Sequence, residues 1–111
     1  LRLADIIHMI RTNIKSNHIQ IENLCKSIFS NMDSIKYSLE DKKILVHHND
    51  SSNPDAASIE FVEYEDKFSV AYWDGYSLAE DFESNNIKDA LKAFKRFSKK
   101  LHKNISRFQK D

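Results

Sequence analysis

The residues best suited to metal chemistry are His47 and His48, which precede Asn49 and Asp50 in the chain. Imidazole and carboxylate groups hold zinc when three or four of them converge on one point. The two histidines end an apolar, β-branched run, residues 43–48, that predicts a strand, and successive residues of a strand point to opposite faces. We therefore expect a strand that leads into a loop, with no bound metal and no other cofactor.

A lone thiol and a group of carboxylates are the other candidates for chemistry. Cys25 follows Leu24 near the apolar stripe of a predicted helix and shares no motif with a histidine or an aspartate, which favours a buried thiol over a nucleophile. Glu80, Asp81 and Glu83 look like paired acid–base carboxylates, but an exposed cluster gives its members no reason for separated pKa values. The chain has a single glycine and so no Gly-rich phosphate loop. We expect a protein that is not an enzyme.

Composition sets the class of protein. A chain of 111 residues predicts one domain, residues 1–111, and 41% hydrophobic residues suffice for a modest core. The formal net charge of zero excludes a global basic field for nucleic acid. One cysteine permits no intramolecular disulfide, which suits the reducing cytosol. No apolar run reaches the length of a membrane span and no signal peptide is visible, so we expect a cytoplasmic protein without a membrane partner.

The last quarter of the chain predicts a long amphipathic helix over residues 87–108. Its apolar residues recur in steps of three, four and seven and form one stripe: Ile87, Ala90, Leu91, Phe94, Phe97, Leu101, Ile105 and Phe108. Basic residues fill most of the other positions, and no Gly or Pro interrupts the run. We expect Asn85 or Asn86 to cap the helix and the stripe to pack on a sheet.

The first 36 residues also predict helix. Isoleucine recurs every seven residues, which fits one long helix or two nearly collinear ones: Ile7, Ile14, Ile21, Ile28 and Ile35. We favour two helices, about 2–15 and 18–36, because Ser16 and Asn17 compete for helical hydrogen bonds and favour caps. A coiled-coil homodimer through residues 1–36, with Asn17 and Asn31 setting the register, is the alternative.

The middle of the chain predicts strands. After the strand at 43–48, an Asn-, Asp- and Ser-rich loop spans residues 49–58 and holds Pro54. A hairpin follows, in which residue 63 pairs with 68, 61 with 70 and 59 with 72. This register puts five apolar side chains on one face: Ile59, Phe61, Phe68, Val70 and Tyr72.

The third strand of this hairpin region begins after Asp74-Gly75, which predicts a two-residue turn. We favour a strand over residues 76–82, whereas a capping box of Ser77 and Glu80 could instead open a short helix. The fold class predicted is α+β. It has two N-terminal helices or one long one, an antiparallel meander of three to four strands, and the long C-terminal helix packed on the sheet.

The charges of this neutral chain are divided between an acidic segment and a basic one. Residues 58–83 hold eight acids and one base, about −7, whereas residues 87–111 hold nine bases and two acids, about +7. The acidic part also carries aromatic residues, and carboxylates around exposed rings are typical of a surface that docks a basic protein. The residues we expect to contact a partner are Glu60, Glu63, Trp73, Asp74, Tyr76, Glu80, Asp81 and Glu83. For Trp73, burial beneath the first helices in a three-layer fold stays open as the alternative.

The segment from Phe61 to Ser84, with the hairpin Tyr-Glu-Asp-Lys and the strand end Asp-Phe-Glu, is followed by Ala90-Leu91 and Phe94 in an Ala-Leu-x-x-Phe helix. This pattern, which covers about half of the chain, resembles small bacterial immunity proteins of contact-dependent growth inhibition systems. The resemblance implies a cytosolic, non-enzymatic inhibitor that plugs the active site of a basic nuclease-type toxin. An acidic, aromatic surface could mimic the nucleic acid that such a toxin binds.

Two hypotheses of other classes remain beside this one. The basic face of the C-terminal helix could bind phosphates of a nucleic acid, although lysine outnumbers arginine there, which does not favour base recognition. Residues 1–36 could instead serve a self-associating structural module.

Overall fold

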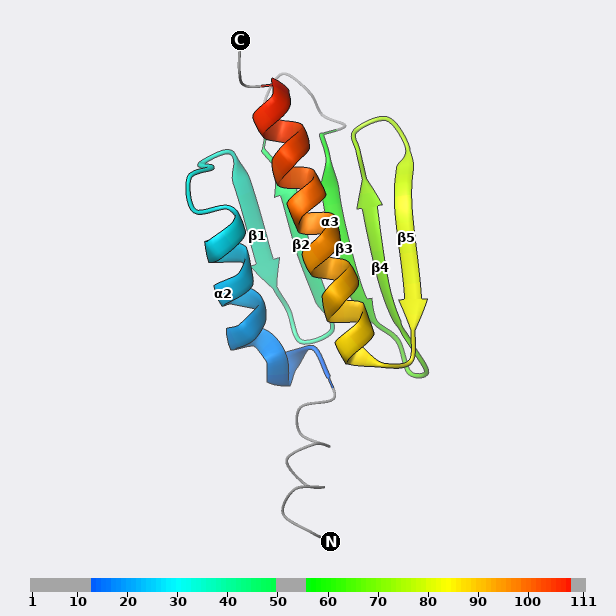
Figure 1. Cartoon of the computed structure of the whole chain (residues 1–111). Coiled ribbons are helices and arrows are strands. Elements are labelled where there is room, and N and C mark those ends of the chain that lie inside the picture. The colour runs from blue at the N-terminus through cyan, green and yellow to red at the C-terminus, as the bar shows by residue number, and fades with distance from the viewer. Residues whose placement is uncertain (1–12, 50–55, 109–111) are drawn as a thin grey trace, which may run out of the picture.

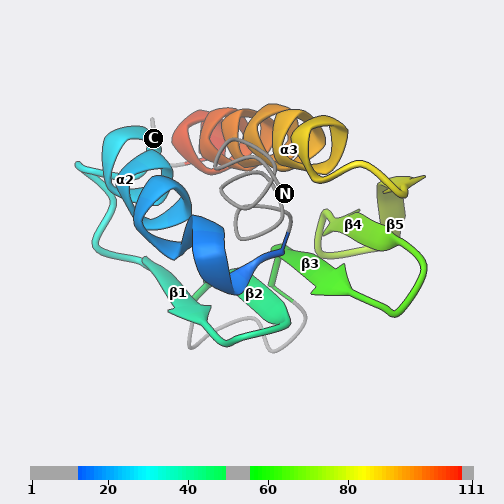
Figure 2. The ribbon, with the colours of Figure 1, turned by 90° about the horizontal axis from the view of Figure 1, so that it is seen from below.

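The computed structural model describes residues 13–49 and 56–108. The elements, in chain order, are the 3₁₀ turn η1 (Lys15–Asn17), α2 (His18–Ile28), β1 (Ile35–Leu39), β2 (Lys43–His48), β3 (Ser58–Glu63), β4 (Phe68–Trp73), β5 (Leu78–Ser84) and α3 (Ile87–Phe108). Figure 1 shows α2 and α3 side by side in front of the sheet, and Figure 2 shows both helices on the same side of it. The predicted α+β class is therefore confirmed, in an arrangement of two layers.

The sheet is an antiparallel meander in the order β1-β2-β3-β4-β5, with five strands instead of the three to four predicted, because residues 35–39 add an edge strand where a helix was expected. The predicted register of the β3–β4 hairpin is confirmed, because Glu63 pairs with Phe68, Phe61 with Val70 and Ile59 with Tyr72. All five apolar residues assigned to one face of this hairpin are buried. The alternation of apolar and polar residues was sufficient here because a shift by one residue would have turned this whole set toward solvent.

Helix α3 spans the predicted residues and covers β3, β4 and β5. Phe94, Phe97 and Leu101 are fully buried, and the ring centroids of Phe94 and Phe61 lie 5.6 Å apart. Asn86 caps the helix as expected, since its Oδ1 accepts a 2.8 Å hydrogen bond from the backbone N–H of Lys88. The apolar stripe thus fixes α3 on the sheet and leaves its lysines in solvent; the side chain of Phe108 lies outside the described residues.

The helix predicted over 18–36 is wrong beyond Ile28. The chain turns after α2, and residues 35–39 form β1, an edge strand that pairs with β2. Ile35 is buried and Tyr37 and Leu39 are half-buried, while Lys36 and Ser38 between them are exposed, which is the alternation of a strand. The heptad spacing of Ile35 therefore coincided with the helical pattern without belonging to it.

The rest of the N-terminal prediction divides into two parts. The helix proposed over 2–15 lies almost entirely outside the described residues. The break near Ser16 takes the form of the 3₁₀ turn at Lys15–Asn17, which runs directly into α2. Ile14 and Ile21 are fully buried in the core of the single chain, so this described part of the stripe is not available for a coiled coil.

The predicted two-residue turn at Asp74-Gly75 is also wrong. Four residues, Asp74 to Ser77, connect the strands, and β5 begins at Leu78 rather than at residue 76. Gly75 has a φ of 100°, a left-handed conformation that favours glycine. The capping-box helix does not form, because Glu80 lies in β5 opposite Tyr72.

Candidate functional site

One face of the sheet carries no helix from the described residues, and we call it the open face. Antiparallel partners project from the same face, so the register places two rows of side chains there. Glu60, Ala71 and Asp81 form one row, and Val62, Ser69 and Glu83 form the next. The short side chains of Ser69 and Ala71 therefore lie between carboxylates, in the half of the open face built from β3, β4 and β5.

The β4–β5 turn places exposed apolar side chains beside these rows. Trp73 pairs with Leu78, and their side chains are 38% and 53% exposed. Tyr76, at the turn itself, is 90% exposed. The pairing shifts between Tyr72 and Trp73, so that Ala79 is an extra residue in β5; such a bulge redirects the side chains next to it. We call Trp73, Tyr76 and Leu78 the aromatic tip.

The conformation of the turn depends on Asp74. Its Oδ1 accepts 2.9 Å hydrogen bonds from the backbone N–H groups of Tyr76 and Ser77. These bonds favour the charged carboxylate, so the backbone N–H of Ser77, and then that of Tyr76, lower the pKa of Asp74 below its usual value. Asp74 therefore holds the loop that presents Tyr76, which is a positioning role within the predicted surface.

Three of the predicted carboxylates form ion pairs with the chain's own lysines. Glu60 lies 3.1 Å from Lys43, Glu83 lies 3.1 Å from Lys67, and Glu80 contacts Lys100 of α3. The carboxylate side chains of these pairs are 38% to 55% exposed. Solvent screens such pairs to about 0–1 kcal/mol each, so a partner's cation can replace a lysine at small cost.

The remaining two carboxylates behave differently from each other. Asp81 is exposed on the open face, and its carboxylate forms no ion pair or hydrogen bond with other described residues. Glu63 accepts a 2.8 Å hydrogen bond from the backbone N–H of Ile14 and thereby ties β3 to the segment that precedes α2. Glu80 projects from the face that α3 covers, since it pairs with Tyr72. Of the predicted acids, Asp81, Glu60 and Glu83 are thus the ones that share the open face.

Sequence reasoning missed Leu78 as a surface residue. The signal available was its position directly after the Asp-Gly-Tyr-Ser turn, next to Trp73 across the hairpin. The three-layer alternative, in which helices bury Trp73, is not what the described helices do, because α2 and α3 lie together on the other face (Figure 2).

The other candidates for chemistry lie apart from this surface. Cys25 is fully buried, and desolvation, with a smaller effect of Glu22, raises the pKa of its thiol to about 12, which disfavours the reactive thiolate. His47 pairs with the exposed Lys36 and His48 with the buried Ile35, so the two histidines lie on opposite faces of the sheet, as expected. Over residues 13–49 and 56–108, no group of three or more His, Cys, Asp or Glu residues could hold a metal ion.

No helix in the described part of the chain is long and apolar enough to cross a membrane. Searches of protein-family models, curated proteins and solved structures found no match to this chain.

Proposed function

We propose that this protein is a non-enzymatic inhibitor that binds a basic protein, of the kind represented by a nuclease-type toxin, through the aromatic tip and the acidic half of the open face. The observation that supports the proposal is the aromatic tip itself. Trp73 and Leu78 are exposed opposite each other at the end of the β4–β5 hairpin, Tyr76 is exposed in the turn between them, and the carboxylate rows lie on the face that no described helix covers. Exposed tyrosine and tryptophan residues are enriched among those that dominate binding energy.

The two parts of the surface have separate physical roles in this proposal. Asp81, Glu60 and Glu83 attract a cationic partner over a distance and raise the rate of encounter. The aromatic tip then buries apolar area, and Tyr76 can bury the largest fraction of its surface on binding because it is 90% exposed in the single chain. Inhibition of this kind needs no cofactor, since occupying a phosphate-binding cleft is enough to exclude the nucleic acid.

The proposal can be tested by identifying and then mapping the partner. A photo-crosslinking amino acid in place of Tyr76 would capture the partner from the native lysate, and mass spectrometry would identify it. We expect a basic domain with nuclease activity that falls when this protein is added. Dissociation constants and association rates would then be measured for Tyr76→Ala and Asp81→Lys.

One control separates the surface from general effects of charge. Asp33→Lys makes the same change of charge as Asp81→Lys, at an exposed position in the α2–β1 connection. We expect Asp81→Lys to slow association about tenfold at low salt and Tyr76→Ala to weaken binding about tenfold or more, while Asp33→Lys changes either by less than about twofold. A partner that binds both surface variants as tightly as the control would reject this surface.

A further inference from the structure

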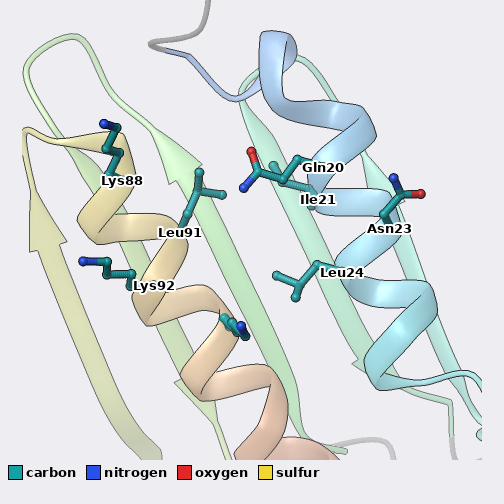
Figure 3. Close-up of a pocket in the computed structure, with 8 residues that line it drawn as sticks. Gln20, Ile21, Asn23, Leu24, Lys88, Leu91 and Lys92 are labelled. Atoms are coloured by element: carbon teal, nitrogen blue, oxygen red, sulfur yellow. The ribbon is translucent and has the colours of Figure 1, made fainter.

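A cavity of about 570 Å³ lies between α2 and α3. We call it the interhelical groove. Figure 3 shows Leu24 of α2 and Leu91 of α3 pointing toward each other across it. Both leucines are half-buried, and Ile21 beneath them is fully buried. The groove therefore offers an apolar floor that the two helices do not close by themselves.

The rim of the groove on the α3 side is cationic, and Figure 3 shows the side chain of Lys92 extending along this rim away from α2. Lys88, Lys92 and Lys95 line it, all three are exposed, and none forms an ion pair or hydrogen bond through its ammonium group within the described part of the chain. The opposite wall has the neutral amides of Gln20 and Asn23. The groove thus combines apolar contact area with positive charge that is not neutralised, whereas Lys43, Lys67 and Lys100 each have a carboxylate partner.

The spacing of these lysines indicates the shape of an anionic partner that would fit them. Steps of four and three residues separate the lysine positions by about 4.5–6 Å each along the axis of α3, at about 1.5 Å per residue. Lys99, which lines a second, smaller cavity between the same helices with His102, continues the row. A single carboxylate head group would engage one end of this row, whereas carboxylates on successive turns of a helix repeat at the same interval.

We propose that the interhelical groove binds an acidic amphipathic helix of a partner protein. Leucine-type side chains of that helix would rest on Leu24 and Leu91, and its flanking carboxylates would pair with Lys88, Lys92 and Lys95. This is the recognition of an amphipathic helix by a groove, with anchors at intervals of three and four residues. The phosphates of a nucleic acid would pair with the lysines but would make no apolar contact with the floor of the groove. The observations therefore favour a peptide.

The probe for the test is a fluorescein-labelled synthetic helix with leucines along one face and glutamates on both flanks. Two analogues carry glutamine in place of every glutamate, or serine in place of every leucine. We expect the parent probe to bind the full chain with a dissociation constant on the order of 10 µM at low salt, and each analogue to bind at least about tenfold more weakly. Amide chemical shifts should change at residues 20–24 and 88–95.

The protein variants form a matched pair. Lys92→Glu with Lys95→Glu reverses charge in the groove, and Lys36→Glu with Lys42→Glu makes the same change at exposed positions elsewhere. We expect the first pair to lower affinity for the probe at least tenfold and the second to alter it less than about twofold. Circular dichroism of all four lysine substitutions should be unchanged, because every one of these side chains is exposed.

Three results would each overturn the proposal. The first is no saturable binding of the parent probe. The second is equal loss of binding in both variant pairs. The third is tighter binding of a DNA duplex than of the probe, with binding of the probe itself independent of its leucines, which would assign the row to nucleic acid. The groove and the open face lie on opposite sides of the sheet layer, so loss of one binding activity leaves the other measurable.

Discussion

Phe94→Ala tests whether α3 is held on the sheet as described. The side chain of Phe94 is fully buried, and its ring centroid lies 5.6 Å from that of Phe61 in β3, with an angle of 38° between the ring planes. Because α3 contacts three strands, this pair joins the helix to the middle of the sheet. Loss of the ring would leave a cavity that its neighbours on the helix and the sheet fill only in part.

The expected cost follows from burial and from the ring pair. Truncation of a buried phenylalanine to alanine costs about 3–5 kcal/mol of unfolding free energy. About 0.5–1.5 kcal/mol of that belongs to the aromatic pair, and a double-mutant cycle of Phe94→Leu with Phe61→Leu should recover it as coupling. The total unfolding free energy of a domain of this size is about 5–15 kcal/mol. If this protein is at the low end of that range, Phe94→Ala should be only marginally stable.

Urea denaturation followed by circular dichroism measures both quantities. With a slope of about 1–3 kcal/mol per molar urea, Phe94→Ala should lower the midpoint by about 2 M, and Phe94→Leu by less than about 1 M. Tyr76→Ala is the control, because an exposed ring should change the unfolding free energy by no more than about 0.5 kcal/mol. A cost below about 1 kcal/mol for Phe94→Ala, or no coupling to Phe61, would refute the described packing of α3.

Three further predictions concern single groups. Ser98 is fully buried in α3 and its hydroxyl has no hydrogen-bond partner among the described residues, so Ser98→Ala should stabilise the protein by about 1 kcal/mol in the same urea assay; destabilisation would show that the hydroxyl is satisfied. Glu63→Ala should cost about 1 kcal/mol because the N–H of Ile14 loses its acceptor, whereas Glu63→Gln, which keeps an acceptor oxygen, should cost less than half as much; equal costs would contradict the hydrogen bond. The thiol of Cys25 ionises near 9.0 when unfolded and at about 12 when folded, so stability should fall as the pH rises above about 9, and Cys25→Ala should lack this part of the alkaline loss. Reaction of the native thiol with a disulfide reagent as fast as that of the urea-unfolded chain would argue against its burial.

Patterns that a single element satisfies by itself were predictable from the sequence. The stripe of α3 repeats over six turns without a breaker, and its cap is a local hydrogen bond of Asn86. The β3–β4 register follows from alternation on two adjacent strands. In each case the residues that decide the structure are close in sequence, so the competing arrangements are few.

Residues 29–39 show why the rest could not be predicted as well. The connection after α2 contains Ser30, Asn31, Asp33 and Ser34, which favour turns, but no Gly or Pro marks the end of the helix. Isoleucine is compatible with either structure, and the choice for Ile35 depends on β2, which offers an edge with which Ile35 to Leu39 can pair. The candidate surface had the same limit, since the contact of Glu80 with Lys100 depends on how α3 lies over β5.

The strictly sequential strand order has a consequence for how the molecule reaches this structure. Each strand pairs with the one synthesised just before it, so the described turns β1–β2, β3–β4 and β4–β5 close over few residues and lose little chain entropy. Contacts of this local kind accompany rapid folding. Among the described elements, helix α3 is the one that contacts three strands at once, and its docking is where we expect the hairpins to become a single cooperative unit.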